Sequence, residues 1–249
     1  MRLPAAGYVE WPAPAALRPA VVCLWARVTP DNKGGQSVVL PDACSDLIWE
    51  QGRGAFVAGP DTGPVLAREV SGTVMFGVRF RSWAGGPVLG LPLSELVDQR
   101  ADLADVRPAD ARLVPGTLDP YPAVAAMLDL TGRLVTDSAV DGDVAHASAL
   151  LADPRIAVEE VAKETALSVR QLRRRFHAAV GYGPKTLQRV LRFHEFVKRM
   201  DDSGFTADLG VVAADLGYSD QAHLTRECAR MAGVTPGALA TIRRPGAPS

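Results

Sequence analysis

The chain has 249 residues, of which 47% are hydrophobic and 22% charged, and its formal net charge is −1. This composition is ordinary for a globular protein, and the length favours two domains over one. No uncharged apolar run approaches the roughly 18 residues that a membrane span needs. Glu10 and several early prolines break the pattern of a secretion signal. We therefore expect a cytoplasmic protein that has no membrane partner.

Charge is divided unevenly along the chain. Residues 1–150 carry 12 basic and 17 acidic groups, whereas residues 151–249 carry 15 and 11. This asymmetry predicts a C-terminal part that meets a polyanion such as nucleic acid and an N-terminal part that does not.

The sequence offers little for catalysis. Cys23, Cys44 and Cys228 are far apart, and no histidine precedes His146, so no metal-ligand spacing exists. Phosphate-loop, dinucleotide-binding and hydrolase motifs are also absent. We expect no cofactor and no bound metal, and we predict that the protein is not an enzyme.

Six short runs rich in Val, Leu and aromatic residues predict strands, separated by clusters of Gly, Pro, Asp and Asn. The runs cover residues 20–28, 36–40, 46–50, 55–58, 65–70 and 73–81. Short strands at close spacing predict a small antiparallel β-barrel or sandwich over residues 1–105. Its aromatic side chains line a candidate effector pocket, with a filled core as the favoured alternative. These side chains are Trp25, Trp49, Phe56, Phe76 and Phe80.

Residues 106–139 are predicted to form a helical linker. The spacing of Val124, Met127 and Leu128 predicts a helix over residues 121–130, with Gly132 just beyond its end. Two interpretations stay open for this segment. It forms a dimerisation element, or it packs on the β-rich domain.

The most basic stretch of the chain is residues 168–199, in which nine of the residues are Lys or Arg and only Glu195 is acidic. Ser168 is a suitable N-cap, and Leu172, Phe176 and Val180 follow at helical spacing. A shorter amphipathic helix is predicted just upstream, over residues 156–162. A helix, a short turn and a second helix with polar residues outside make a helix-turn-helix unit, whose second helix enters the major groove.

The same pattern returns downstream. Residues 209–216 read as a helix that ends at Gly217, and Ser219 is a candidate cap for a helix over residues 220–231. Between the two units, residues 184–200 form one predicted helix with apolar residues around most of its circumference. Such a helix suits a rigid spacer between two helix-turn-helix units. We assign residues 140–241 to this all-α domain and residues 242–249 to a flexible tail.

Two segments carry a family resemblance, namely ALSVRQLRRRFHAAVGYGPK (166–185) and VVAADLGYSDQAHLTRECARMAGVTPGAL (211–239). Residues 140–240 thereby resemble the DNA-binding domain of the AraC/XylS family of bacterial transcription regulators. Cys228 is a departure, since the family usually has an aromatic residue there, and we expect looser packing around it. CLWARV (23–28) and VLPDACSDLIWE (39–50) make residues 8–105 resemble the cupin-like β-barrel often fused to such regulators.

The function expected from charge, geometry and resemblance is that of a sequence-specific regulator, activator or repressor, that reads two successive major-groove segments. Its expected partners are double-stranded DNA, a small effector at the N-terminal domain, RNA polymerase and a second copy of the chain. In the alternative function no effector binds, and the N-terminal domain serves only dimerisation or protein contacts. The candidate base-reading residues are Arg170, Arg173, Arg174, Ala222, His223 and Arg226. The candidate phosphate-contacting residues are Ser168, Arg175, Lys185, Thr186, Arg189, Ser219 and Gln221.

Overall fold

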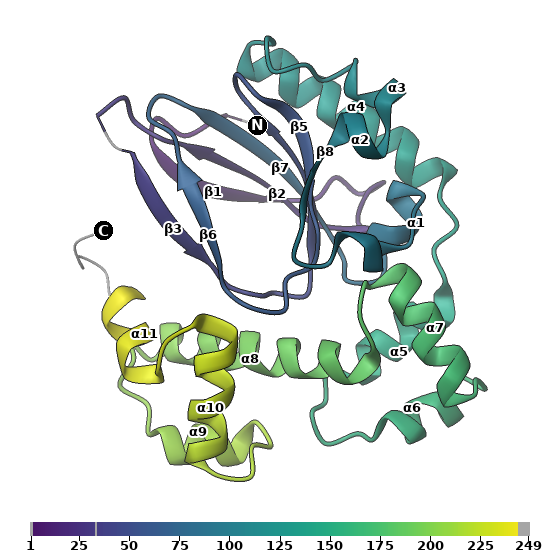
Figure 1. The fold of residues 1–249 in the computed structure, drawn as a ribbon, viewed down its shortest axis with the longest axis vertical. Coiled ribbons are helices and arrows are strands. Elements are labelled where there is room, and N and C mark those ends of the chain that lie inside the picture. The colour runs from purple at the N-terminus through teal and green to yellow at the C-terminus, as the bar shows by residue number, and fades with distance from the viewer. Residues whose placement is uncertain (1, 33, 244–249) are drawn as a thin grey trace.

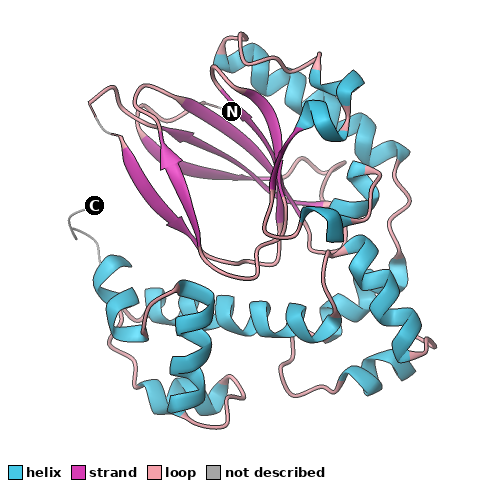
Figure 2. Ribbon diagram, viewed as in Figure 1, coloured by secondary structure: helices cyan, strands magenta, loops and turns pink. Residues whose placement is uncertain are grey.

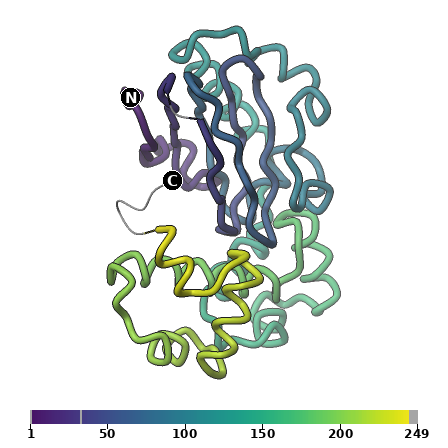
Figure 3. Tube along the Cα trace, turned by 60° about the vertical axis from the view of Figure 1, so that its left-hand side comes forward, coloured from purple at the N-terminus to yellow at the C-terminus, as the bar shows by residue number. Residues whose placement is uncertain are grey.

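The structure, a computed structural model, describes residues 2–32 and 34–243. A β-rich N-terminal part and a helical C-terminal part are stacked one above the other (Figures 1 and 2). The view in Figure 3, turned by 60°, shows the same two layers. The predicted α+β class, with a strand-rich domain followed by a helical domain, is confirmed.

The N-terminal part is built on a six-stranded sheet whose neighbouring strands are all antiparallel. In spatial order its strands are β1 (Gly7–Pro12), β2 (Val21–Val28), β7 (Val74–Phe80), β4 (Ser45–Glu50), β5 (Gly54–Ala58) and β8 (Arg100–Asp102). A second, two-stranded sheet pairs β3 (Gly35–Val39) with β6 (Val65–Glu69). Among the residues described, β1 and β8 do not pair with each other, so the large sheet stays open. All six predicted strands are present to within one residue at each end, whereas β1 and β8 were not predicted.

The helices that follow the sheet cover one of its faces. They are α1 (Gly85–Leu89), α2 (Leu103–Val106), α3 (Pro108–Ala111) and α4 (Pro120–Asp137), with a 3-10 turn, η1 (Leu93–Leu96). Because side chains alternate along a strand, Leu47 and Trp49 of β4 join the core under these helices, while Ile48 faces the other side. The core therefore lies between the sheet and α4, and the opposite face carries a smaller apolar cluster.

Helix α4 is longer than the sequence predicted. It runs to Asp137, and Gly132 lies inside it, so the prediction that the helix ends before Gly132 is wrong. A mid-helix glycine costs about 1 kcal/mol relative to alanine. Burial outweighs that cost, because the row of apolar side chains that α4 buries against the sheet continues past the glycine to Leu134, which is 5% exposed.

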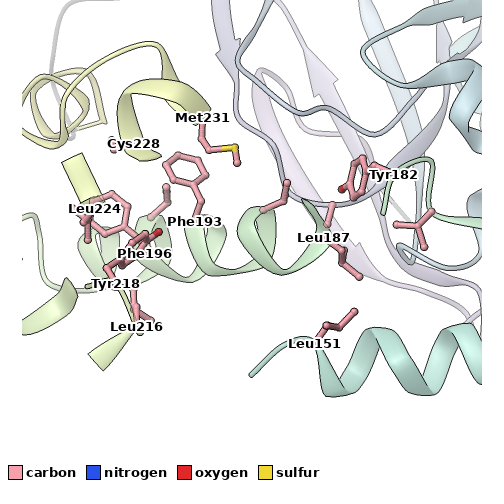
Figure 4. Close-up of a cluster of buried hydrophobic side chains, with 14 of the residues drawn as sticks. Leu151, Tyr182, Leu187, Phe193, Phe196, Leu216, Tyr218, Leu224, Cys228 and Met231 are labelled. Carbon is pink, nitrogen blue, oxygen red and sulfur yellow. The ribbon is translucent and has the colours of Figure 1, made fainter. Parts of the chain in front are cut away.

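The C-terminal part consists of α5 (Gly142–Leu150), α6 (Val158–Glu164), α7 (Val169–Ala179), α8 (Pro184–Asp202), α9 (Leu209–Asp215), α10 (Gln221–Ala232) and α11 (Pro236–Arg243). Helix α8 runs between the α5–α7 group and the α9–α11 group (Figure 1). Leu187 and Tyr182 pack at its beginning, and Phe193 and Phe196 pack near its end against Leu224 (Figure 4). The predicted spacer helix, apolar around most of its circumference, is confirmed.

The two parts meet at the C-terminal end of α7, which packs against α1 and η1. Gly86 of α1 lies so close that a Cβ built there would sit 2.2 Å from the carbonyl oxygen of Ala178 and 3.1 Å from Cα of Ala179. Gly181, at φ +96°, approaches Pro60 and Val97 in the same way. Glycine is thus required where the first helix-turn-helix unit touches the N-terminal domain. Over the described ranges, no helix has both the length and the apolar character to cross a membrane.

Candidate nucleic-acid interface

The first candidate recognition helix is α7, and its start is capped on both sides. The Ser168 hydroxyl accepts a hydrogen bond from the amide of Gln171 at 3.2 Å, and the Gln171 side chain accepts one from the amide of Ser168 at 2.9 Å. Leu172 and Phe176 are fully buried beneath the helix. This capping box fixes the first turn of α7, as the sequence predicted for Ser168.

Arg170, Arg173 and Arg174 stand on the outer side of α7. All three are exposed, and none of their side chains makes an ion pair or hydrogen bond with any other residue that the structure describes. Recognition helices place the residues of their N-terminal half at base edges. The three guanidinium groups are therefore available to an external acceptor on the first two turns of a capped helix.

Arg175, on the same helix, is engaged within the protein. Its Nη1 lies 2.7 Å from Asp143 and 3.3 Å from Asp141, at the start of α5. Asp141 also caps α5 by accepting hydrogen bonds from the amides of Asp143 and Val144. Arg175 therefore ties α7 to α5, and this geometry does not favour the predicted phosphate contact.

The second candidate recognition helix, α10, is capped by Asp220. The Asp220 carboxylate accepts a hydrogen bond from the amide of His223 at 2.6 Å. The prediction that Ser219 caps this helix is therefore wrong. Ser219 instead donates its amide hydrogen to Nδ1 of His223 at 3.3 Å. Because Asp220 immediately precedes the helix, its side chain takes the capping position one residue later than expected.

The base-reading candidates of α10 lie in its first two turns. Ala222 and Arg226 are exposed, and Arg226 has no ion pair with any residue in the described part of the chain. The ring of Tyr218 meets the ring of His223 edge-on at 5.3 Å and helps to hold it. Since Nδ1 of His223 accepts from Ser219, Nε2 carries the proton and can donate to an external acceptor. Gln221, a phosphate candidate, is exposed at the start of the same helix.

The phosphate candidates on α8 differ in their surroundings. Lys185 is exposed and donates to the side chain of Gln188 at 2.7 Å, and Thr186 is half-buried in the first turn. Arg189 points at α10, where it forms a two-pronged ion pair with Glu227 at 2.9 and 3.2 Å. The predicted phosphate role therefore fits Arg189 poorly, because its Nε and Nη2 are bound to Glu227 inside the domain.

Comparison with known families locates the same region. Residues 161–241, from α6 to α11, match the family described as a helix-turn-helix domain. The C-terminal domain is a helix-turn-helix domain of the AraC type. Residues 9–102 match a domain of unknown function (DUF6597). No curated protein matches the sequence.

Two solved structures of ToxT from Vibrio cholerae resemble the chain. One is 9% identical, covers 87% of this chain and 97% of its own, and gives a TM-score of 0.46. The other, described as unsaturated fatty acid bound, is also 9% identical, covers 96% and 97%, and gives a TM-score of 0.42.

Cys228 is the residue at which the sequence was expected to depart from the pattern of the family that it resembles. It is 1% exposed and belongs to the core between α8 and α10, next to Leu224 and Met231. Burial raises the pKa of its thiol to about 12, which keeps the sulfur protonated. Cys228 therefore acts as a small apolar core residue rather than a reactive group.

The predicted aromatic pocket of the N-terminal domain does not form as one site. Trp25 and Phe56 lie in the cluster on one face of the large sheet. Trp49, Phe76 and Phe80 lie on the other face, in the core under the helices, and none of the three is measurably exposed. The prediction of a shared lining is wrong because alternation along the strands separates the two groups.

A buried ion-pair network lies beside Trp25. The indole nitrogen donates to Asp46 at 2.6 Å, and Nε of Arg79 lies 3.3 Å from Asp46 and 3.4 Å from Asp42. Burial raises the pKa of Asp46 to about 6, although Arg79 lowers it. The sequence signal for this network is Arg79, a charged residue in an otherwise apolar strand, on the face opposite Val78 and Phe80. In the described part of the chain, no group of three His, Cys, Asp or Glu residues could hold a metal ion.

A cavity of about 450 Å³ lies where this sheet face meets α8 of the AraC-type domain. Leu40, Phe193 and Val197 supply apolar walls. The lining also carries charges of both signs, from Arg79, Lys198 and Arg243 and from Asp42, Asp201 and Asp202. Sequence reasoning missed this cavity, because its walls come from segments more than 100 residues apart.

Proposed function

We propose that this protein is a sequence-specific DNA-binding transcription regulator that reads two successive major-groove segments. The observation that supports it best is the set of unpaired arginines on α7, namely Arg170, Arg173 and Arg174. A capped helix with Arg226 exposed repeats the arrangement at α10. Arginine pairs bidentately with guanine, so both helices carry side chains suited to base readout.

The spacer agrees with this proposal. Helix α8 has 19 residues and spans about 28 Å at the usual helical rise. Helices α7 and α10 lie at its two ends (Figure 1). Successive major-groove segments on one side of a duplex are roughly 34 Å apart. One chain can therefore address two segments without a second copy, and such a regulator acts in the cytoplasm, where bacterial DNA is found.

Selection of bound sequences from random duplex DNA is expected to recover two conserved blocks centred about 10 base pairs apart. The full-length protein should be used at a stated salt concentration, because phosphate contacts make affinity fall with salt. Binding that shows no motif and only disappears as salt rises would reduce the site to a non-specific basic surface.

We also propose that a small effector bound in the 450 Å³ cavity controls DNA binding. The cavity touches both domains, since Val39 and Arg79 line it from the N-terminal domain and His194 and Lys198 from α8. A ligand there would contact the helix that carries both recognition units. In the alternative, the N-terminal domain binds no effector and serves a second copy or RNA polymerase. The outer face of α4, with the exposed Tyr121, is then a candidate surface.

A ligand that binds only the folded protein raises its melting temperature. Screening a metabolite panel by thermal shift is therefore expected to find a stabilising compound. Val39→Trp, which fills the cavity from a 39% exposed position, should abolish that shift. Leu66→Trp, on the neighbouring strand β6 but outside the cavity, should keep it. A panel without any stabilising compound would favour the ligand-independent alternative.

A further inference from the structure

Three arginines of α8 face the second helix-turn-helix unit rather than solvent. Arg189 pairs with Glu227 of α10. Arg192 lies 4.4 Å above the Tyr218 ring and donates to the carbonyl of Gly217 at 3.2 Å. Arg199 pairs with Asp215, the last residue of α9, at 3.2 Å. The spacer thus contacts α9, the turn and α10 through a separate guanidinium group each.

The first unit is attached to α8 by other means. Gln188, which is 1% exposed, donates to the carbonyls of Asp153 and Ile156 at 3.0 and 2.9 Å. The end of α7 is also held by the N-terminal domain through Gly86 and Gly181. The first unit is therefore joined to α8 through one buried amide side chain, whereas the second unit is joined to it through three guanidinium groups.

The Arg189–Glu227 pair is the most enclosed of these contacts. The two side chains are 25% and 10% exposed, and the bond is two-pronged. Burial alone raises the pKa of Glu227, but Arg189, Arg230 and Arg192 offset it, so that pKa lies below its usual value. A planar two-pronged pair holds both distance and angle, which a lysine in the same place does not.

We propose that the Arg189–Glu227 pair is a positioning clamp that sets the angle of α10 on α8 and thereby the spacing of DNA blocks that the protein accepts. Glu227 directly follows the base-reading candidate Arg226 and is four residues after His223. A rotation of α10 that breaks the pair would therefore move both base-reading side chains. This inference rests on the proposed function, because it concerns how the two recognition helices are held relative to each other.

The test uses full-length protein and the two-block site obtained by selection, together with versions in which one base pair is added to or removed from the gap. Wild type is expected to bind the natural spacing about tenfold more tightly than either altered spacing. Arg189→Lys and Glu227→Gln are expected to lose most of this preference. Their affinity for random duplex DNA should stay within about twofold of wild type, because no phosphate contact is removed.

A phosphate role for Arg189 makes the opposite prediction. Glu227→Gln would then strengthen binding to every sequence, and Arg189→Lys would be nearly neutral because the charge is kept. Arg189→Gln, Glu227→Gln and the double variant Arg189→Gln/Glu227→Gln together form a cycle, in which a clamp gives strongly non-additive losses of spacing preference. Arg230→Gln is the matched control, because Arg230 is 64% exposed and only 3.7 Å from the same carboxylate.

Different results would overturn the proposed function and the clamp. If wild type selects no two-block site, the proposed function itself is overturned. If wild type prefers one spacing and both clamp variants keep that preference, the clamp is overturned while the proposed function stands. The melting temperature of each variant shows whether it is folded under the binding conditions. Glu227→Gln keeps the shape of the side chain and is therefore the variant expected to keep the fold.

Discussion

Arg174→Ala is expected to weaken binding to the selected DNA site by about 1–3 kcal/mol and to relax sequence preference at one position. Arg174 is exposed on the second turn of α7 and makes no ion pair with other residues of the described chain. Its removal therefore leaves no buried partner behind, and the whole loss belongs to the contact with DNA. Fluorescence anisotropy with the selected site and with single-base variants measures both effects.

Arg112→Ala is a charge-matched control for this experiment. Arg112 is also exposed, but it follows α3 in the N-terminal domain, away from both recognition helices. It should change affinity little beyond the loss of one distant charge. Equal binding of wild type and Arg174→Ala would refute the base-reading assignment. A uniform loss on all sequences, with a smaller salt dependence, would move Arg174 to the phosphate-contacting group.

The two candidate recognition helices present different side chains to DNA under the proposed function. Helix α7 offers three unpaired arginines, whereas α10 offers Ala222, His223 and Arg226. Arginine favours guanine, while alanine can contact only an apolar group such as the thymine methyl. The block read by α7 should therefore be richer in guanine and contribute more of the affinity.

Local signals in the sequence were sufficient for six of the eight strands that the structure describes and for the first cap. The strands could be located because Gly, Pro and Asp residues bound each one. The cap at Ser168 could be predicted because a capping box depends on residues only three apart. Strands β1 and β8 escaped prediction. The first ends at Pro12 and the second has only three residues, so their pairing with longer neighbours defines them.

Contacts between residues far apart in the chain could not be predicted from the sequence. The sequence predicted that Trp25 and Trp49 line one pocket, but the pairing of the strands and the placement of the helices put them on opposite faces of the large sheet. Likewise, Arg189 belongs to a basic stretch typical of a phosphate-binding surface, but its partner Glu227 is 38 residues away. The pattern of charged residues predicts the sign of the charge on a surface, whereas the ion pairs between helices depend on how the helices pack.

The contact between the two domains is the feature furthest from any sequence signal, and Gly86→Ala tests it. An added Cβ would lie 2.2 Å from the carbonyl oxygen of Ala178 and 3.1 Å from Cα of Ala179. Both are backbone atoms at the end of α7, so neither can move aside as a flexible side chain would. We expect a loss of about 1–3 kcal/mol in the free energy of unfolding, measured by urea denaturation.

Gly132→Ala provides a control with the opposite sign. Gly132 lies inside α4, and a Cβ built there has no other atom within 4 Å. Alanine favours a helix interior over glycine by about 1 kcal/mol, so this variant should be more stable than wild type. Wild-type stability in Gly86→Ala would mean that α1 and α7 are not in contact in solution. If Gly86→Ala lowers both the stability and the affinity for the selected DNA site, the N-terminal domain holds α7 in the orientation that binds DNA.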